Sequence, residues 1–290
     1  YGGFWDGTGI VQAKYAIYQV VPMIAAYCCT DSAFYRSGEI FERIIAGLTY
    51  IRGAQHENGL FDYITCNFFS APDTAFCLKK LLPVYEYLRG MGEEGVSPAE
   101  KVSWTGKITA EEISPAEKVS WTGKIAAGEM EILRRLEEII KDGAEGMLAG
   151  GFHTPNHRWA IASILMACSK YFGSRKMEEA ANTYLKEGID CNEDGEFSEK
   201  SAGNYNRINN DAMILLSQVT GDTTYEQHVL RNLRMMLTYI EPDGSIFTAN
   251  STRFDKDLLV YPTDYYMEYL RMGQKYNIPE FLAMCNFIFD

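Results

Sequence analysis

The segment Glu193-Asp194-Gly195-Glu196-Phe197 is a turn sequence that recurs along the chain. Glu57-Asn58-Gly59-Leu60-Phe61 precedes it and Pro242-Asp243-Gly244-Ser245-Ile246-Phe247 follows it, each with an acid or amide before the glycine and an apolar residue soon after. Glycine supplies the positive φ that such a turn needs, and the apolar residue can pack back between helices. The glycines of the last two turns lie 49 residues apart, and Gly151 lies 44 residues before the earlier of them. A unit that repeats at this interval indicates an array of helix pairs.

Apolar residues recur at helical spacing between these turns. In Met130–Ile140, for example, the apolar residues share one face while arginines and glutamates occupy the other. No segment gives a convincing β-strand pattern, so the sequence predicts an all-α fold. The predicted helices cover Val11–Cys29, Ala33–Ile51, Ala75–Leu88, Glu129–Leu148, Arg158–Tyr171, Met177–Leu185, Asn209–Val219, Tyr225–Ile240 and Asp264–Tyr276.

The interval between the turn at Gly59 and Gly151 is longer than the other two intervals. A tandem duplication accounts for the additional residues. The segment Ser97–Ile108 reappears as Ser114–Ile125, offset by 17 residues. Proline, glycine and charge in each copy predict an inserted surface element at about residues 92–126. The simpler interpretation is a duplication tolerated in a loop, because loops accept insertions at low cost. A second interpretation is that its two tryptophans, Trp104 and Trp121, stack on sugar rings.

Composition narrows the class of protein. Hydrophobic residues make up 47% of the 290 residues and charged residues 23%, as in folded globular proteins. A net charge of -12 argues against a nucleic-acid partner, because phosphate contacts need clustered Lys and Arg. The longest apolar run, Val20–Cys29, contains Pro22 and is too short to span a membrane. The sequence does not predict an oligomeric state.

The seven cysteines form neither a disulfide framework nor a CxxC metal motif. Most have apolar neighbours, as Cys77 and Cys168 do, and are predicted to be buried free thiols. Free thiols favour a cytoplasmic location, whereas a secreted or periplasmic location stays open if a signal peptide was removed. Because the chain begins with Tyr1 and ends at Asp290 after an apolar stretch, we interpret it as trimmed.

Three segments between the predicted helices carry more polar and aromatic groups than a connection needs. In the first, residues 61–74, Asp73 is interpreted as a helix cap or first-turn acid. Asn67 lies beside Phe68 and Phe69, which suggests a cleft wall with one polar contact. A ligand contact and a loop hydrogen bond are both open for Asn67.

The second segment, residues 150–159, holds two of the four histidines. His153 and His157 are four residues apart, but Pro155 between them argues against one continuous helix. No metal-ligand spacing accompanies them, so neither a metal nor another cofactor is predicted. The amide here could simply cap the helix. However, Asn156–Trp159 places an amide, an imidazole, a cation and an aromatic ring at one helix start, which favours a functional role.

The third segment, residues 195–211, is rich in asparagine and leads into a helix. Asn209 and Asp211 can simply start that helix. Tyr205 lies two residues before Arg207, and a nearby cation favours a phenolate. A tyrosine so placed can accept or donate a proton.

Together these motifs resemble a known family. Gly-Phe-His-Thr-Pro-Asn-His-Arg-Trp at 151–159, followed 48 residues after His157 by Tyr205 in Gly-Asn-Tyr-Asn, is similar to the heparinase II/III-like and alginate-lyase-like polysaccharide lyases. The resemblance covers most of the chain as a helix-pair pattern. It implies an (α/α) toroid, which the repeated turns also favour, formed as one domain over residues 1–290. In this family a β-rich domain usually follows the toroid. Three interpretations are open here: that domain has been cut off, the enzyme works without it, or the toroid is a non-catalytic relative.

The resemblance further implies a reaction and its residues. In this family an Asn or His neutralises the uronate carboxylate, and a Tyr about fifty residues later donates a proton, so the implied catalytic residues are Asn156, His157 and Tyr205. The reaction is β-elimination in an acidic polysaccharide or oligosaccharide, for which an acidic chain must concentrate cations in its cleft. The predicted substrate-binding residues are Asn67, His153, Arg158, Trp159, Asn204, Arg207 and Arg253.

Two other functions stay open. One is a glycoside hydrolase on the same toroid, similar to enzymes that act on unsaturated uronyl oligosaccharides, with an aspartate pair as general acid and base. The other is a carbohydrate-binding helical domain without catalysis. The candidate acids for the hydrolase are Asp62, Asp73, Asp194, Asp211 and Asp264, most of which also have a simple cap or turn role.

Overall fold

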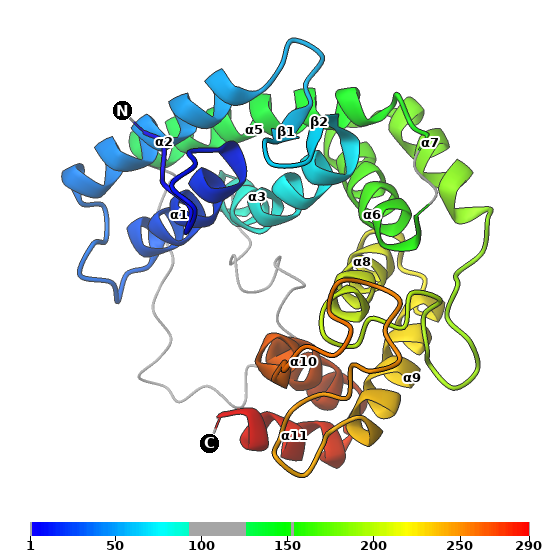
Figure 1. Ribbon diagram of the computed structural model, residues 1–290. Coiled ribbons are helices and arrows are strands. Elements are labelled where there is room, and N and C mark those ends of the chain that lie inside the picture. Colours follow the sequence, from blue (N-terminus) through cyan, green and yellow to red (C-terminus); the bar gives the residue numbers. More distant parts are fainter. Residues whose placement is uncertain (1, 93–125, 152–153, 290) are drawn as a thin grey trace. The chain divides into compact units, whose positions relative to one another are not determined.

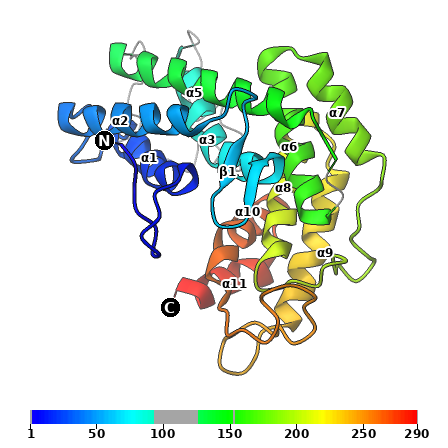
Figure 2. The same ribbon diagram turned by 45° about the horizontal axis from the view of Figure 1, so that its top comes forward.

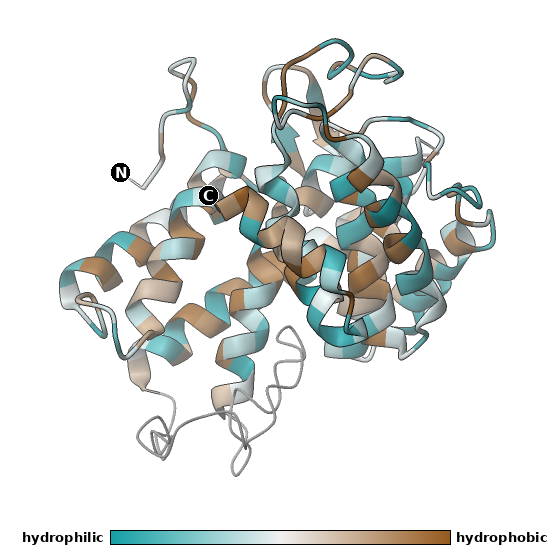
Figure 3. Cartoon of the chain, turned by 90° about the horizontal axis from the view of Figure 1, so that it is seen from below, coloured by the Kyte–Doolittle hydropathy of each residue, from teal (hydrophilic) through white to brown (hydrophobic). Residues whose placement is uncertain are grey.

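The computed structural model describes residues 2–92, 126–151 and 154–289 (Figure 1). These residues contain ten α-helices and one short β-hairpin, so the prediction of a mainly helical fold is confirmed. Figure 3 shows hydrophobic and hydrophilic residues alternating around the helices, as expected where one face of a helix packs against a core. The duplicated segment, with Trp104 and Trp121, lies outside the described residues, as does His153.

The chain divides into two compact units. Among the described residues, unit 1 contains residues up to 92, 126–151 and 172–177, and unit 2 contains 154–171 and 178–289. Each unit is described by itself below. The single-domain toroid stays a prediction.

Unit 1 is built from four long helices and the hairpin (Figures 1 and 2). Helix α1 packs against α2 and α3, and α3 packs against α5. Strands β1 and β2 pair in antiparallel fashion immediately before α3. The hairpin was not predicted because its strands are only three and four residues long. The elements are α1 (Ala13–Cys28), α2 (Gly38–Ala54), β1 (Phe61–Tyr63), β2 (Asn67–Ser70), α3 (Ala71–Gly92) and α5 (Ala127–Met147).

Unit 2 contains further helix pairs, of which α8 packs against α9 and α10 against α11. In helix α6 the residues from Trp159 to Ser169 are all buried. Helix α11 was not predicted, although its apolar stretch was noted. The elements are α6 (Pro155–Phe172), α7 (Arg175–Leu185), α8 (Tyr205–Thr220), α9 (Thr224–Thr238), the 3-10 helix η1 (Pro262–Tyr265), α10 (Tyr266–Tyr276) and α11 (Pro279–Phe289).

The repeated turns share one hydrogen-bond pattern. In the turn at Gly195, Asn192 N–H donates to the Glu196 carbonyl at 3.0 Å and Gly195 N–H donates to the Asn192 carbonyl at 3.1 Å. The turns at Gly59 and Gly244 repeat both bonds, and all three glycines have φ between 83° and 95°. The predicted positive φ is therefore confirmed.

A fourth copy of this turn, missed in the sequence, lies near the N-terminus. Asp6 N–H donates to the Ile10 carbonyl at 2.8 Å, and Gly9 N–H donates to the Asp6 carbonyl at 3.1 Å with φ of 82° at Gly9. The copies precede α1, the β1–β2 hairpin, α8 and η1, respectively. The local repeat thus runs through both units, with one turn before each of four helix pairs.

Gly195→Ala is expected to destabilise the protein more than Gly188→Ala. Both glycines have positive φ, 95° and 80°, which costs a non-glycine residue about 1 kcal/mol or more. A Cβ at position 195 would also lie 2.4 Å from the Arg231 backbone of α9, whereas at position 188 nothing lies within 4 Å. We expect a loss of roughly 3 kcal/mol for Gly195→Ala and roughly 1 kcal/mol for Gly188→Ala, measured by urea unfolding. Equal losses would contradict a close packing of this turn on α9.

The cysteines are reduced in this structure. Cys28, Cys77, Cys168 and Cys285 are buried, and all seven are free thiols. Burial raises the pKa of Cys77 to about 12 and that of Cys168 to about 12, so these thiols stay protonated and unreactive. No helix in the described part of the chain is long and apolar enough to cross a membrane.

Candidate functional site

A carboxylate from a distant loop holds the N-terminus of α6. Pro155 begins the helix, and Asn156 follows it with a fully buried side chain. The Asn156 backbone N–H donates to the Glu199 carboxylate at 3.1 Å, and Asn156 Nδ2 donates to both of its oxygens at 2.7 and 3.0 Å. A carboxylate at this position satisfies an N–H group that has no partner within the helix and complements the helix dipole.

These bonds leave only one polar atom of the Asn156 side chain for another partner. Because Nδ2 donates to Glu199, the orientation of the amide is fixed. Asn156 Oδ1 is buried and has no hydrogen-bond partner among the described residues. An unpaired buried acceptor costs free energy, so this oxygen is suited to accept a hydrogen bond from a buried water.

Glu199 also ties the loop at residues 251–255 to the start of α6. Its carboxylate Oε1 lies 3.3 Å from Arg253 Nε, and its carbonyl accepts hydrogen bonds from Thr252 N–H and Oγ1. Burial raises the pKa of Glu199 above its ordinary value, although the Asn156 bonds and the Arg253 charge act in the opposite direction. The carboxylate is therefore costly to bury, and these partners offset part of that cost.

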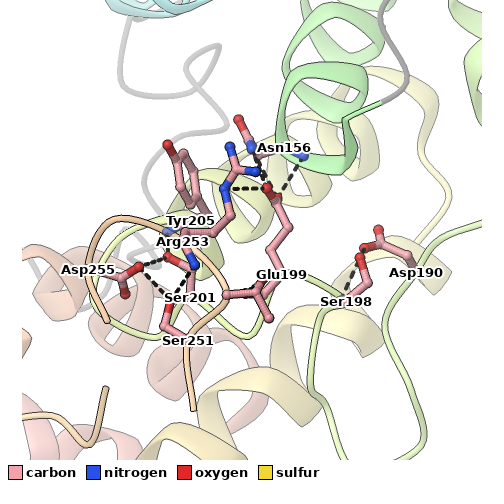
Figure 4. Close-up of polar contacts among 10 residues, drawn as sticks. Asn156, Asp190, Ser198, Glu199, Ser201, Tyr205, Ser251, Arg253 and Asp255 are labelled. Carbon is pink, nitrogen blue, oxygen red and sulfur yellow. Dashed lines mark hydrogen bonds and ion pairs between the residues drawn. The ribbon is translucent and has the colours of Figure 1, made fainter. Parts of the chain in front are cut away.

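Tyr205 lies beside Arg253 at the start of α8 (Figure 4). The Arg253 guanidinium carbon is 5.0 Å from the centre of the Tyr205 ring, within the range of a cation–π contact. Phe254 packs edge-on against the same ring at 5.9 Å and is 67% exposed. Figure 4 shows the Tyr205 ring and the guanidinium close to the Asn156 and Glu199 side chains. A phenol, a cation, an amide oxygen and an exposed aromatic ring thus gather in unit 2.

A second buried carboxylate fixes the two loops that carry Tyr205 and Arg253. Asp255 is 1% exposed and accepts hydrogen bonds from Ser201 Oγ at 2.8 Å, Ser251 Oγ at 2.7 Å and Gly203 N–H at 3.0 Å. Ser201 Oγ also accepts the Tyr205 backbone N–H at 3.1 Å. The backbone positions of Tyr205 and Arg253 are therefore set by the same cluster of hydrogen bonds.

The structure corrects the prediction that Trp159 binds substrate. Its side chain is fully buried, and Nε1 donates to Asp190 Oδ1 at 2.7 Å, so the ring belongs to the core. Arg158 lies over this ring at 4.1 Å and forms ion pairs with Glu187 and Asp190. At the start of α6, Arg158 and Trp159 therefore stabilise the fold, although the sequence predicts that they bind substrate.

Arg207 is not the cation beside Tyr205. It forms ion pairs at 3.5 Å with Asp211, one turn further along α8, and with Asp264. Asn204 is the N-cap residue of α8 and makes no capping hydrogen bond through its side chain. The cation that the sequence placed at Arg207 is supplied instead by Arg253, 48 residues after Tyr205.

The remaining predicted site residues are not joined to this cluster by the contacts described above. His157 follows Asn156 in the first turn of α6 and is partly exposed. Asn67 belongs to β2 in unit 1, where Nδ2 donates to Asp73 Oδ2 at 3.2 Å. His153 lies outside the described residues. In the described part of the chain, no group of three or more His, Cys, Asp or Glu side chains is placed to hold a metal ion.

Glu199 and Asp255 are the polar residues of this cluster that sequence reasoning missed. Glu199 lies in a segment of many charged residues, and Asp255 lies in a loop with Lys256 and Asp257. Neither has a local pattern that distinguishes a buried carboxylate from an exposed one. Their role depends on partners 43 to 54 residues away in the chain.

Comparison of the chain with protein-family models, with curated proteins and with solved structures gave no match. The site is therefore interpreted from its own geometry.

Proposed function

We propose that the chain is a polysaccharide lyase that cleaves a uronic-acid-containing polysaccharide by β-elimination. The observation that carries this proposal is the pairing of Tyr205 with Arg253 at 5.0 Å, beside Asn156 at the start of α6. β-Elimination at a uronate needs a cation or hydrogen-bond donor for the carboxylate and a group that moves protons next to it. Arg253 and Tyr205 are groups of these two kinds.

The reaction breaks the C5–H bond and the C4–O bond of the uronate and forms a C4–C5 double bond. The C5 proton is hardly acidic while the adjacent carboxylate is charged, so that charge must be neutralised as the proton leaves. Tyr205 or His157 accepts the C5 proton, and Tyr205 delivers a proton to the departing sugar oxygen. Tyrosine suits both roles because its hydroxyl can donate and accept.

Arg253 is the group that we assign to the uronate carboxylate. Its side chain is 35% exposed and its guanidinium can form paired hydrogen bonds with a carboxylate. The Asn156 NH2 group, in contrast, is engaged by Glu199. Asn156 is fully buried and is therefore assigned a positioning role, in which its amide holds the Glu199 carboxylate that pairs with Arg253.

Arg253→Ala is expected to lower kcat/KM by roughly ten- to a hundredfold, because a hydrogen bond to a charged group contributes about 1.5–3 kcal/mol. Arg253→Lys keeps the charge without the paired geometry and is expected to recover part of this loss. Lys256→Ala is the matched control, since Lys256 is an exposed cation of the same loop. Unchanged kcat/KM in Arg253→Ala would remove Arg253 from the proposed site.

One observation favours a glycoside hydrolase as the second candidate. The general acid of such an enzyme needs a raised pKa, and burial raises the pKa of Glu199. However, Glu199 is 5% exposed and already binds Asn156 and Arg253, which leaves it poorly placed to reach a sugar oxygen. Asp211 and Asp264, both predicted as possible acids, are paired with Arg207.

The three candidate functions give different products. A lyase creates a double bond, so the absorbance of near-ultraviolet light rises. A hydrolase that acts on unsaturated oligosaccharides lowers this absorbance. A binding domain without catalysis leaves the absorbance unchanged. Incubation with alginate, hyaluronan, heparin and polygalacturonate tests the proposal. A rise in absorbance with at least one of them supports it, and a fall with unsaturated oligosaccharides supports the hydrolase.

A further inference from the structure

Phe69 in unit 1 has an unusual backbone conformation. Its φ is 49°, in the left-handed region that bulky residues rarely adopt. The residue is nevertheless 55% exposed, so little burial offsets the strain. Strain of this kind persists only where the surrounding structure enforces it, and it concentrates at binding and catalytic sites.

Phe69 is held in this conformation by two contacts of its own and by a third contact between its partners. Its backbone N–H donates to Asp62 Oδ1 at 2.7 Å across the β1–β2 hairpin. The same oxygen lies 2.9 Å from His56 Nε2. The His56 ring in turn lies against the Phe69 ring, with centres 4.1 Å apart and planes inclined by 32°. One face of the phenyl ring is thus in contact with His56, while the residue as a whole stays 55% exposed.

We propose that this ring is a stacking platform for a pyranose ring of an oligosaccharide. The Phe69 platform, defined as Phe69, His56 and Asp62, combines an exposed aromatic ring with the imidazole stacked against it and the carboxylate that contacts this imidazole. An aromatic face suits the C–H face of a sugar, while the polar groups suit its hydroxyls. The presence of uronate in this oligosaccharide rests on the proposed function. The binding of a pyranose ring at the platform does not rest on it.

The polar groups near Phe69 distinguish this surface from a purely apolar docking surface. A lipid or a protein helix would gain from contiguous apolar area, whereas here a carboxylate and an imidazole adjoin the ring. Asn67 adds an exposed amide two residues before Phe69 on β2. The surface therefore fits a ligand that offers both C–H groups and hydroxyls.

The test compares stability with binding in one set of variants. All variants carry Tyr205→Phe, so that a substrate is not consumed, and calorimetry measures the Kd for hexasaccharides of alginate, hyaluronan and polygalacturonate and for neutral cellohexaose. Phe69→Gly is expected to weaken binding of at least one of them about tenfold, while Tm stays equal or rises because glycine accepts positive φ. Phe69→Trp is expected to keep the affinity within about threefold. Phe34→Ala removes another exposed ring of unit 1, 51% exposed, and serves as the control with unchanged affinity.

Three results would overturn the platform: equal affinity in Phe69→Gly and its parent, no binding of any saccharide, or Phe69-dependent binding to phosphatidylcholine vesicles without saccharide binding. Failure of the proposed function gives a different pattern, in which the unmodified chain forms no unsaturated product while saccharide binding still depends on Phe69. Product formation with Phe69-independent binding would leave the lyase proposal intact and remove only the platform.

Discussion

Tyr205→Phe is expected to lower kcat by at least about a hundredfold while the Kd for substrate changes little. The substitution removes only the hydroxyl, and positioned proton transfer contributes roughly 10²–10⁴ to rate. The ring contacts with Arg253 and Phe254 are retained, so the packing around position 205 should persist. Steady-state kinetics measure kcat, and calorimetry measures the Kd.

Tyr261→Phe is the matched control for this prediction. Tyr261 is 49% exposed and lies in unit 2, so the same chemical change there should leave kcat unaltered. Full activity in Tyr205→Phe would assign the proton transfer to another residue. A loss of binding together with activity would instead indicate that Tyr205 only holds the substrate.

Glu199→Ala is expected to destabilise the protein by about 3 kcal/mol and to abolish activity. Removal of the carboxylate leaves the buried Asn156 amide and the Arg253 guanidinium without their shared partner, and breaking a buried pair from one side costs about this much. Glu193→Ala, at an exposed position in the adjoining turn, should change stability by less than about 0.5 kcal/mol. Urea unfolding of both variants measures the difference.

Glu199→Gln adds a pH dependence to this test. Because burial raises the pKa of Glu199, the protonated carboxyl is favoured in the folded state. Its stabilising contribution is present below the ordinary pKa of 4.5 and is lost as pH rises through the folded-state pKa. The free energy of unfolding of the unmodified chain should therefore fall relative to Glu199→Gln between acidic and neutral pH. A difference that is independent of pH would contradict a raised pKa.

The helical fold was predictable because its signals are local. Helical spacing of apolar residues located nine of the helices, and glycine at positive φ marked three of the repeated turns. The fourth turn, at Gly9, was missed because Asp6-Gly7-Thr8-Gly9-Ile10 has its acid earlier and offers two glycines. The repeat is therefore recognised from the hydrogen bonds of that turn and not from its amino-acid sequence.

The candidate site was predictable only in part, because its contacts join distant segments. Tyr205 and Asn156 were identified from dense polar motifs, but the residues that connect them, Glu199 and Arg253, meet only in the folded chain. Trp159 was predicted to bind substrate but is buried in the core. An aromatic ring at the start of a helix can pack in the core as readily as it can contact a ligand. Sequence adjacency also suggested Arg207 as the cation for Tyr205, whereas two aspartates bind that arginine.

The ratio of double bonds to new reducing ends tests the proposed β-elimination most directly. Each elimination creates one C4–C5 double bond for every new reducing end, whereas each hydrolysis creates a reducing end alone. With a uronate polysaccharide that the chain degrades, near-ultraviolet absorbance and a reducing-end assay on the same sample should give a ratio of about one, as the reaction requires. New reducing ends without absorbance, or no degradation of any uronate polysaccharide, would contradict the account.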